Sequence, residues 1–147
     1  MPRAALISAA LRHVRDAEHL LAPGPHRSVE QALHLAGFGP ECARKACLDE
    51  EVADKALGHD IDGAGDPAVD LLLALDPSAS RYGIDGHASE LPHRARHWNL
   101  ECRYMATGEP ASIEQMVADV VREARAFVDR CVADLWCDGA VPPGSLR

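Results

Sequence analysis

The sequence predicts an all-α fold, an up-and-down bundle of four to five helices, from three observations. Apolar residues recur at intervals of three and four over much of the chain, which is the period of an amphipathic helix. No stretch alternates apolar and polar residues as a half-buried strand does. Runs rich in proline and glycine, such as Pro23 to Pro25 and Gly108 to Pro110, separate the helical patterns and predict turns.

The first helical pattern covers residues 3–22 and stops at Pro23, which cannot continue a helix. Arg12, Arg15 and Asp16 lie toward the face that we expect to be solvated. The opposite, apolar face consists of Leu6, Ile7, Ala10, Leu11, Val14, Ala17, Leu20 and Leu21.

The central helical pattern covers residues 28–48, with Ser28 as its N-cap. Because this segment is apolar or small on nearly every side, we expect a buried helix that neighbouring helices approach closely. Pro40 lies inside it and predicts a kink or a break. The small residues that permit close approach are Ala32, Ala36, Gly37, Gly39, Ala43 and Ala46.

The longest helical pattern covers about residues 113–137, and Ser112 with Gln115 forms a capping box at its start. Between the central helix and this one, we expect a further helix over residues 66–76 and a loop over residues 78–86.

Length, composition and charge favour a single folded domain. The chain has 147 residues, of which 47% are hydrophobic and only 4% aromatic, and this suits one aliphatic core. The formal net charge of −8 argues against broad, non-specific nucleic-acid binding but leaves room for a local basic site. We expect one domain over residues 1–138 and a frayed tail over residues 139–147.

The N-terminal segment and the cysteines indicate a cytoplasmic protein. Charged residues interrupt the N-terminal segment, so it lacks the apolar run of a secretory signal, and no stretch is long enough to span a membrane. The five cysteines are odd in number and include no CxxC pair. We therefore expect reduced thiols, not disulfides or a zinc site.

One segment, from His87 to Tyr104, is strongly basic although the chain as a whole is acidic. Its apolar anchors are Trp98, Leu100 and Tyr104, and its basic side chains are His87, His93, Arg94, Arg96, His97 and Arg103. Such a cluster indicates an interface for an anionic ligand.

The run QALHLAGFGPECARKACL, from Gln31 to Leu48, resembles the central helix of the HEPN superfamily, the higher eukaryotes and prokaryotes nucleotide-binding domain. Its most specific part is Glu-Cys-Ala-x-Lys-Ala from Glu41 to Ala46. Gly58-His59-Asp60, Trp98 and Arg103-Tyr104 follow in the order of the family. The resemblance implies a helical bundle that forms a homodimer.

The branch of the superfamily that the chain most resembles implies a site made of Glu41, Lys45, Arg103 and Tyr104, with His59 nearby. Glu41 and Lys45 are four residues apart in the favourable order for an ion pair. A buried Arg103 would need a carboxylate, and Glu41 is a natural candidate. The same residues also fit a structural network that only fixes the register of the helices, so both interpretations remain open.

Many HEPN domains are metal-independent ribonucleases, and their motif is an Arg, a polar residue and, several residues later, a His. The His acts as general acid or base while the Arg stabilises the phosphate. The pairs Arg81–His87 and Arg27–His34 fit this spacing, although Tyr82 replaces the polar residue in the first. This alternative implies a toxin-like endoribonuclease with a composite dimeric site and a nucleotidyltransferase-type antitoxin as partner.

The preferred hypothesis is a small HEPN-like domain that binds a nucleotide, RNA or another anionic ligand. The candidate ligand-binding residues are Lys45, His34, Arg94, Arg96, His97 and Trp98.

A further alternative is a small-molecule enzyme or accessory protein of bacterial metabolism on the same scaffold. This alternative includes a histidine-bound metal, because His87, His93 and His97 offer three imidazoles. A carboxylate or thiolate partner is missing beside them, so we expect neither a metal nor a cofactor.

Overall fold

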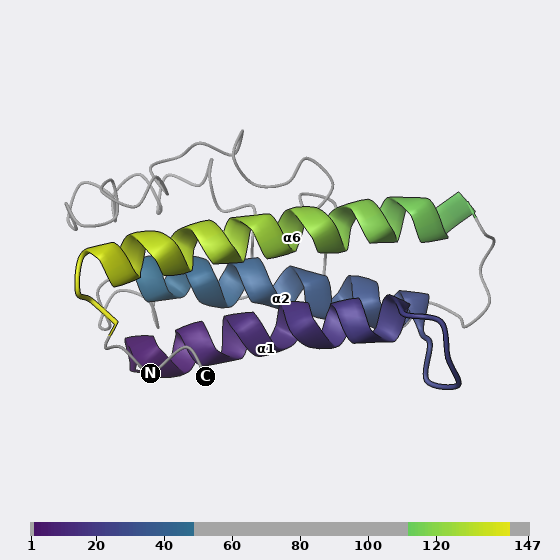
Figure 1. The fold of residues 1–147 in the computed structure, drawn as a ribbon, viewed down its shortest axis with the longest axis horizontal. Helices are drawn as coiled ribbons and strands as arrows, with labels where there is room; N and C mark the ends of the chain where they lie inside the picture. The colour runs from purple at the N-terminus through teal and green to yellow at the C-terminus, as the bar shows by residue number, and fades with distance from the viewer. Residues whose placement is uncertain (1, 49–111, 142–147) are drawn as a thin grey trace, which may run out of the picture.

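A computed structural model gives the fold, and it describes residues 2–48 and 112–141. These residues form three helices, α1 (Arg3–Leu21), α2 (Val29–Cys47) and α6 (Ser112–Cys137), and no strand. The all-α prediction is confirmed for this part of the chain, while the helix expected over residues 66–76 lies outside it. Figure 1 shows the three helices packed side by side, with α2 and α6 running in one direction and α1 in the other. None of the three is long and apolar enough to cross a membrane.

Helix α1 buries the face that the sequence predicts. Leu6, Ile7, Ala10, Val14 and Ala17 are buried, and Leu11, Leu20 and Leu21 pack against the same core. The charged face formed by Arg12, Arg15 and Asp16 is exposed, as expected. The chain leaves the helix at Ala22, whose backbone N–H donates to the carbonyls of Glu18 and His19.

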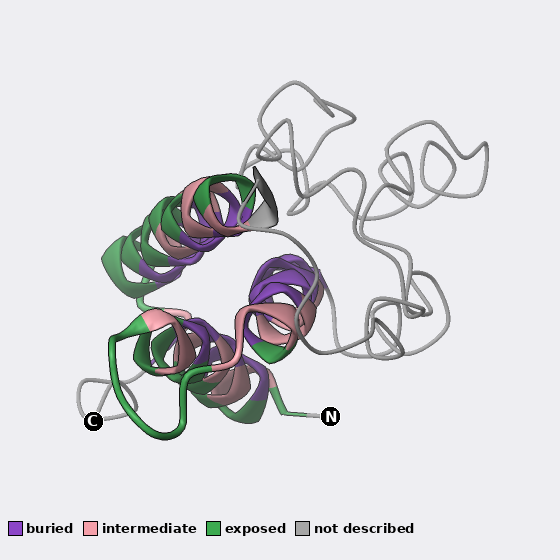
Figure 2. Ribbon diagram, turned by 90° about the vertical axis from the view of Figure 1, so that its right-hand side faces the viewer, coloured by how far each residue is buried: buried purple, intermediate pink, exposed green. Residues whose placement is uncertain are grey.

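Helix α2 begins where the sequence predicts, because the backbone N–H of Gln31 donates to Oγ of Ser28 at 3.3 Å. It is buried around most of its circumference, and Figure 2, which looks nearly along the helices, shows the colours of buried and intermediate residues around most of α2. The alternative of a break at Pro40 is wrong, since the helix continues through this residue to Cys47. The proline ring is fully buried, so its packing offsets the backbone hydrogen bond that the residue cannot donate.

At Gly39, the backbone of α2 lies close to residues of both α1 and α6. A Cβ atom at this position would lie 2.5 Å from Cγ1 of Val14 on α1 and 3.5 Å from Cγ2 of Val128 on α6. The carbonyl oxygen of Ala10 would also lie 3.5 Å away. Only glycine leaves room for this approach.

Helix α6 ends in a Schellman motif that holds the next residues against the core. Gly139 has a positive φ of 68°, and the N–H of Ala140 donates to the carbonyl of Leu135 at 2.9 Å. Val141 is 1% exposed and belongs to the core. The chain therefore stays packed through Val141, although the sequence suggested fraying from Gly139; residues 142–147 lie outside the described part.

Candidate functional site

The predicted ion pair on the central helix is present. Nζ of Lys45 donates to Oε1 of Glu41 at 2.8 Å, across one turn of α2. The side chain of Glu41 is only 4% exposed and that of Lys45 is 18% exposed. A carboxylate at this depth must be paired, because an isolated buried charge is costly. Arg44, the next charged residue on the helix, is also buried.

Two histidines and one phenylalanine extend this polar cluster across the contact between α1 and α2. The Phe38 ring packs edge-on to His34, with centroids 4.8 Å apart, and lies 5.5 Å from the ring of His13 on α1. Nδ1 of His13 is buried and accepts or donates no hydrogen bond within the described residues. The two histidines thus hold Phe38 between them at the helix interface.

Burial shifts the protonation equilibria of two groups in this cluster. It lowers the pKa of His13 below its ordinary value; Arg12 and His34 lower it further, whereas Asp16 and Glu41 oppose the change. Burial, aided by Glu41, raises the pKa of Cys42 to about 11. At neutral pH the cluster therefore contains a neutral imidazole at His13 and a protonated thiol at Cys42, so neither side chain carries a charge.

A pair of thiols lies deeper than Cys42, between α2 and α6. Cys47 and Cys131 are both buried and both are free thiols. Their mutual hydrogen bond, together with burial, raises the pKa of Cys47. A thiol that resists ionisation is a poor nucleophile and a poor metal ligand, which gives Cys47 a packing role. The residues that the structure describes include no group of three metal-binding side chains.

In the structure, the predicted pair Arg27 and His34 have different partners. Arg27 precedes α2 and forms two hydrogen bonds to the carboxylate of Glu114 on α6, at 2.8 and 3.1 Å. Its Nε also donates to the carbonyl of Leu21. His34 lies about 9 Å along the helix axis from Ser28, at a rise of about 1.5 Å per residue. Its ring packs on Phe38. The guanidinium of Arg27 therefore links the segment before α2 to Leu21 of α1 and to Glu114 of α6.

The structure therefore brings three of the predicted site residues, Glu41, Lys45 and His34, onto the buried central helix. The other predicted site residues lie outside the described part of the chain, and these are His59, Arg81, His87, Arg94, Arg96, His97, Trp98, Arg103 and Tyr104.

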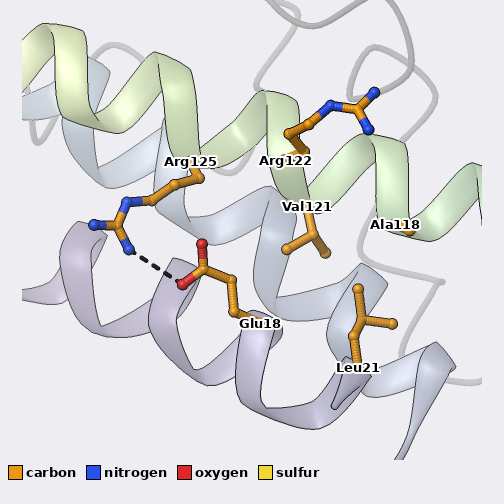
Figure 3. Close-up of a pocket in the computed structure, with 6 residues that line it drawn as sticks. All are labelled: Glu18, Leu21, Ala118, Val121, Arg122 and Arg125. Carbon is orange, nitrogen blue, oxygen red and sulfur yellow. Dashed lines mark hydrogen bonds and ion pairs between the residues drawn. The ribbon is translucent and has the colours of Figure 1, made fainter. Parts of the chain in front are cut away.

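The sequence did not predict a pocket that lies between α1 and α6. This seam pocket has a volume of about 280 Å³ and is lined by Glu18, Leu21, Ala118, Val121, Arg122 and Arg125. Nη1 of Arg125 donates to Oε2 of Glu18 across the seam at 3.1 Å. Figure 3 shows this ion pair together with Leu21 and Val121, which form an apolar floor. Its residues come from segments about a hundred positions apart, so no local pattern could have revealed it.

Comparison with known proteins identifies no relative: no family model, curated protein or solved structure matches the chain.

Proposed function

We propose that this protein is a small HEPN-like helical domain that binds a nucleotide, RNA or another anionic ligand through the segment from His87 to Tyr104. The observation that carries the proposal is the charge pattern. This segment gathers six basic or histidine side chains within a chain whose formal net charge is −8. A local basic cluster on an acidic protein attracts an anion to one place rather than to the whole surface.

The central helix supports the proposal in a second way. The run that resembles the HEPN helix forms α2, and its signature residues Glu41 and Lys45 pair in a buried position. A buried charged pair on the central helix suits the framework of a ligand site as well as a structural network. The complete proposal comprises a bundle of four to five helices, a homodimer and a cytoplasmic location.

Fluorescence anisotropy with the full-length protein tests the proposal. A labelled single-stranded RNA is titrated with wild type and with Arg94→Ala/Arg96→Ala, and ATP serves as an unlabelled competitor. The control is Arg12→Ala/Arg15→Ala, which removes the same charge from the exposed face of α1. We expect the first variant to bind at least tenfold more weakly and the control to bind nearly as well as wild type.

Equal weakening by both double variants would contradict the proposal, because it would reveal only a response to total charge. Incubating the same RNA with wild type in EDTA tests the nuclease alternative. Cleavage that disappears in His87→Ala, with the fold intact by circular dichroism, would make the protein a metal-independent ribonuclease.

A further inference from the structure

One face of α6 is turned away from α1 and α2, and Figure 2 shows its residues in the colour of exposed ones. This outer face includes a tryptophan that is 53% exposed, although proteins usually cover so large an apolar side chain. The exposed residues of the outer face are Arg122, Ala126, Asp129, Arg130, Ala133 and Trp136.

We propose that the outer face of α6 binds the same face of a second copy of this chain, with the two helices antiparallel. Trp136 of each copy enters the seam pocket of the other. The inference deepens the homodimer of the proposed function, on which it rests, by assigning its surface.

The helical repeat places the tryptophan and the seam pocket on one side of α6. Eighteen residues separate Ala118, which lines the pocket, from Trp136, and this is five turns of 3.6 residues. One side of the helix therefore carries an apolar pocket toward its start and an exposed indole at its end. A two-fold axis between antiparallel copies brings each of these features against the other, as in a self-complementary interface.

An axis at Ala126 gives the register. Trp136 lies ten residues after this alanine, so it comes level with Met116 of the second copy, ten residues before it. Side chains on a helix lean toward its N-terminus, and the indole therefore leans from that level toward the partner's Ala118. The small alanine side chain at the axis allows the two helices to approach to about 8 Å.

The lining of the seam pocket suits an indole. Its volume of about 280 Å³ lies just below the range of sites for whole small molecules, about 300–1,000 Å³, and fits a single side chain. Leu21, Ala118 and Val121 offer apolar contacts to the ring. Glu18 also lines the pocket, and its carboxylate can accept the indole N–H, which usually finds a partner when it is buried.

Charges on the outer face are complementary in this register. One edge of the face carries Arg122 and Asp129, and the other carries Glu123 and Arg130, each pair seven residues apart. With the axis at Ala126, Arg122 comes beside the partner's Asp129, and Glu123 comes beside the partner's Arg130. The two-fold axis repeats both pairs, so opposite charges meet at four places and fix the register.

Sedimentation velocity of the full-length protein, without RNA, tests the role of the tryptophan. Wild type is expected to dimerise, and Trp136→Ala is expected to raise the dissociation constant of the dimer at least tenfold, because a buried aromatic anchor is lost. Met116→Ala is the control, since this residue is the other exposed large apolar side chain of the described part of α6, at 38%. It is expected to dimerise nearly as tightly as wild type.

A charge exchange tests the register. Arg122→Asp and Asp129→Arg, both at exposed positions, are each expected to weaken the dimer, because each brings like charges together. The double variant Arg122→Asp/Asp129→Arg restores opposite charges between the copies and is expected to dimerise more tightly than either single variant. Circular dichroism of each variant verifies the fold.

A cross-linking experiment tests the antiparallel orientation in a Cys137→Ser background. Ala126→Cys places two thiols next to each other at the axis, so oxidation with copper phenanthroline is expected to give a covalent dimer. Ala133→Cys, at another exposed alanine of the same face, places the two thiols about 21 Å apart and is expected to give no more than the parent.

A monomeric wild type, an unchanged dissociation constant in Trp136→Ala, or equal cross-linking through Ala133→Cys and Ala126→Cys would each overturn this interface. A dimer that persists unchanged in Trp136→Ala would retain the homodimer of the proposed function and reject only its assigned surface. Arg94→Ala/Arg96→Ala is expected to dimerise normally, so a failure of RNA binding is distinguishable from a failure of the interface.

Discussion

At Gly39 the missing side chain is what allows α1, α2 and α6 to meet. Replacing it with alanine would place a methyl group 2.5 Å from the side chain of Val14. Alanine favours a helix by about 1 kcal/mol over glycine, but overpacking costs about 1–3 kcal/mol, and Val14 cannot move freely between two packed helices. We expect Gly39→Ala to lower the free energy of unfolding by up to about 2 kcal/mol in urea denaturation.

The double variant Gly39→Ala/Val14→Ala identifies the cause. Val14→Ala removes the methyl group that the new Cβ would strike, so the double variant should lose less stability than the two single variants together. Strict additivity would mean that the loss at Gly39 has another origin.

Two ion pairs, each within one helix, differ in burial. Comparing them measures how much burial adds to the contribution of an ion pair to stability. Lys45→Met removes one partner of Glu41, which is 4% exposed, and should cost about 1–3 kcal/mol of unfolding free energy. Arg122→Met breaks the pair with Asp119 at a site where the arginine is 70% exposed, and should cost less than about 0.5 kcal/mol. Equal losses in chemical denaturation would show that the Glu41–Lys45 pair contributes no more than a surface pair.

The lowered pKa of His13 gives stability a defined dependence on pH. The unfolded chain binds a proton at His13 near pH 6.5 more readily than the folded protein does. The stability that depends on neutral His13 is therefore fully present above that pH. It declines as the pH falls toward the folded pKa. We expect wild type to lose more stability than His13→Gln between pH 7.5 and 5.0 in urea titrations; identical losses would exclude His13 as the cause.

The residue scale also shows the limits of a sequence-based account. The pair Glu41–Lys45 follows from a spacing of four within one helix, and the structure confirms it. The contact of His13 with Phe38 was not predicted, because it joins two helices whose mutual register no local pattern contains.

At the scale of elements, one side chain of α1 closes the end of α2. Nε of Arg3 donates to the carbonyl of Ala46 at 2.7 Å, and Nη2 donates to the carbonyl of Leu48 at 3.1 Å. These carbonyls lie at the helix C-terminus, where a cation is favourable and partners within the helix are missing. Arg3 therefore connects the start of the first helix to the end of the second.

Removing this connection should loosen the last turn of α2 before the rest of the protein. In Arg3→Ala, we expect hydrogen exchange of the amides of Lys45 to Leu48 to accelerate at least tenfold, while those of α6 change little. Arg15→Ala, on the exposed face of the same helix, serves as the control. Uniform acceleration across all helices would instead indicate a global loss of stability.

Helix boundaries were the most predictable feature of the fold. Residues 3–22 and 113–137 were expected, and the helices are Arg3–Leu21 and Ser112–Cys137, because amphipathic periodicity and turn residues are encoded locally. Pro40 was harder to interpret, since its local cost is visible in the sequence whereas the burial that offsets it depends on the other helices.

At the scale of the whole molecule, the arrangement of helices creates features that no single element has. The ion pair between Arg125 and Glu18 joins residues 107 positions apart, and the seam pocket lies beside it. The sequence predicted a helical bundle but not which faces would meet, so the pocket required the structure. The basic segment from His87 to Tyr104 shows the reverse. Its charge pattern is visible in the sequence, but its residues lie outside the described part of the chain.

The salt dependence of RNA binding tests the central claim most directly. The affinity of wild type and of Arg94→Ala/Arg96→Ala for one labelled single-stranded RNA is measured by anisotropy between about 50 and 200 mM salt. Each phosphate contact contributes about −0.7 to the slope of log K against log salt, so losing two should make the slope less negative by about 1.4. The account predicts this change in the Arg94/Arg96 variant and a wild-type slope in Arg12→Ala/Arg15→Ala. Parallel slopes for wild type and both variants would contradict it.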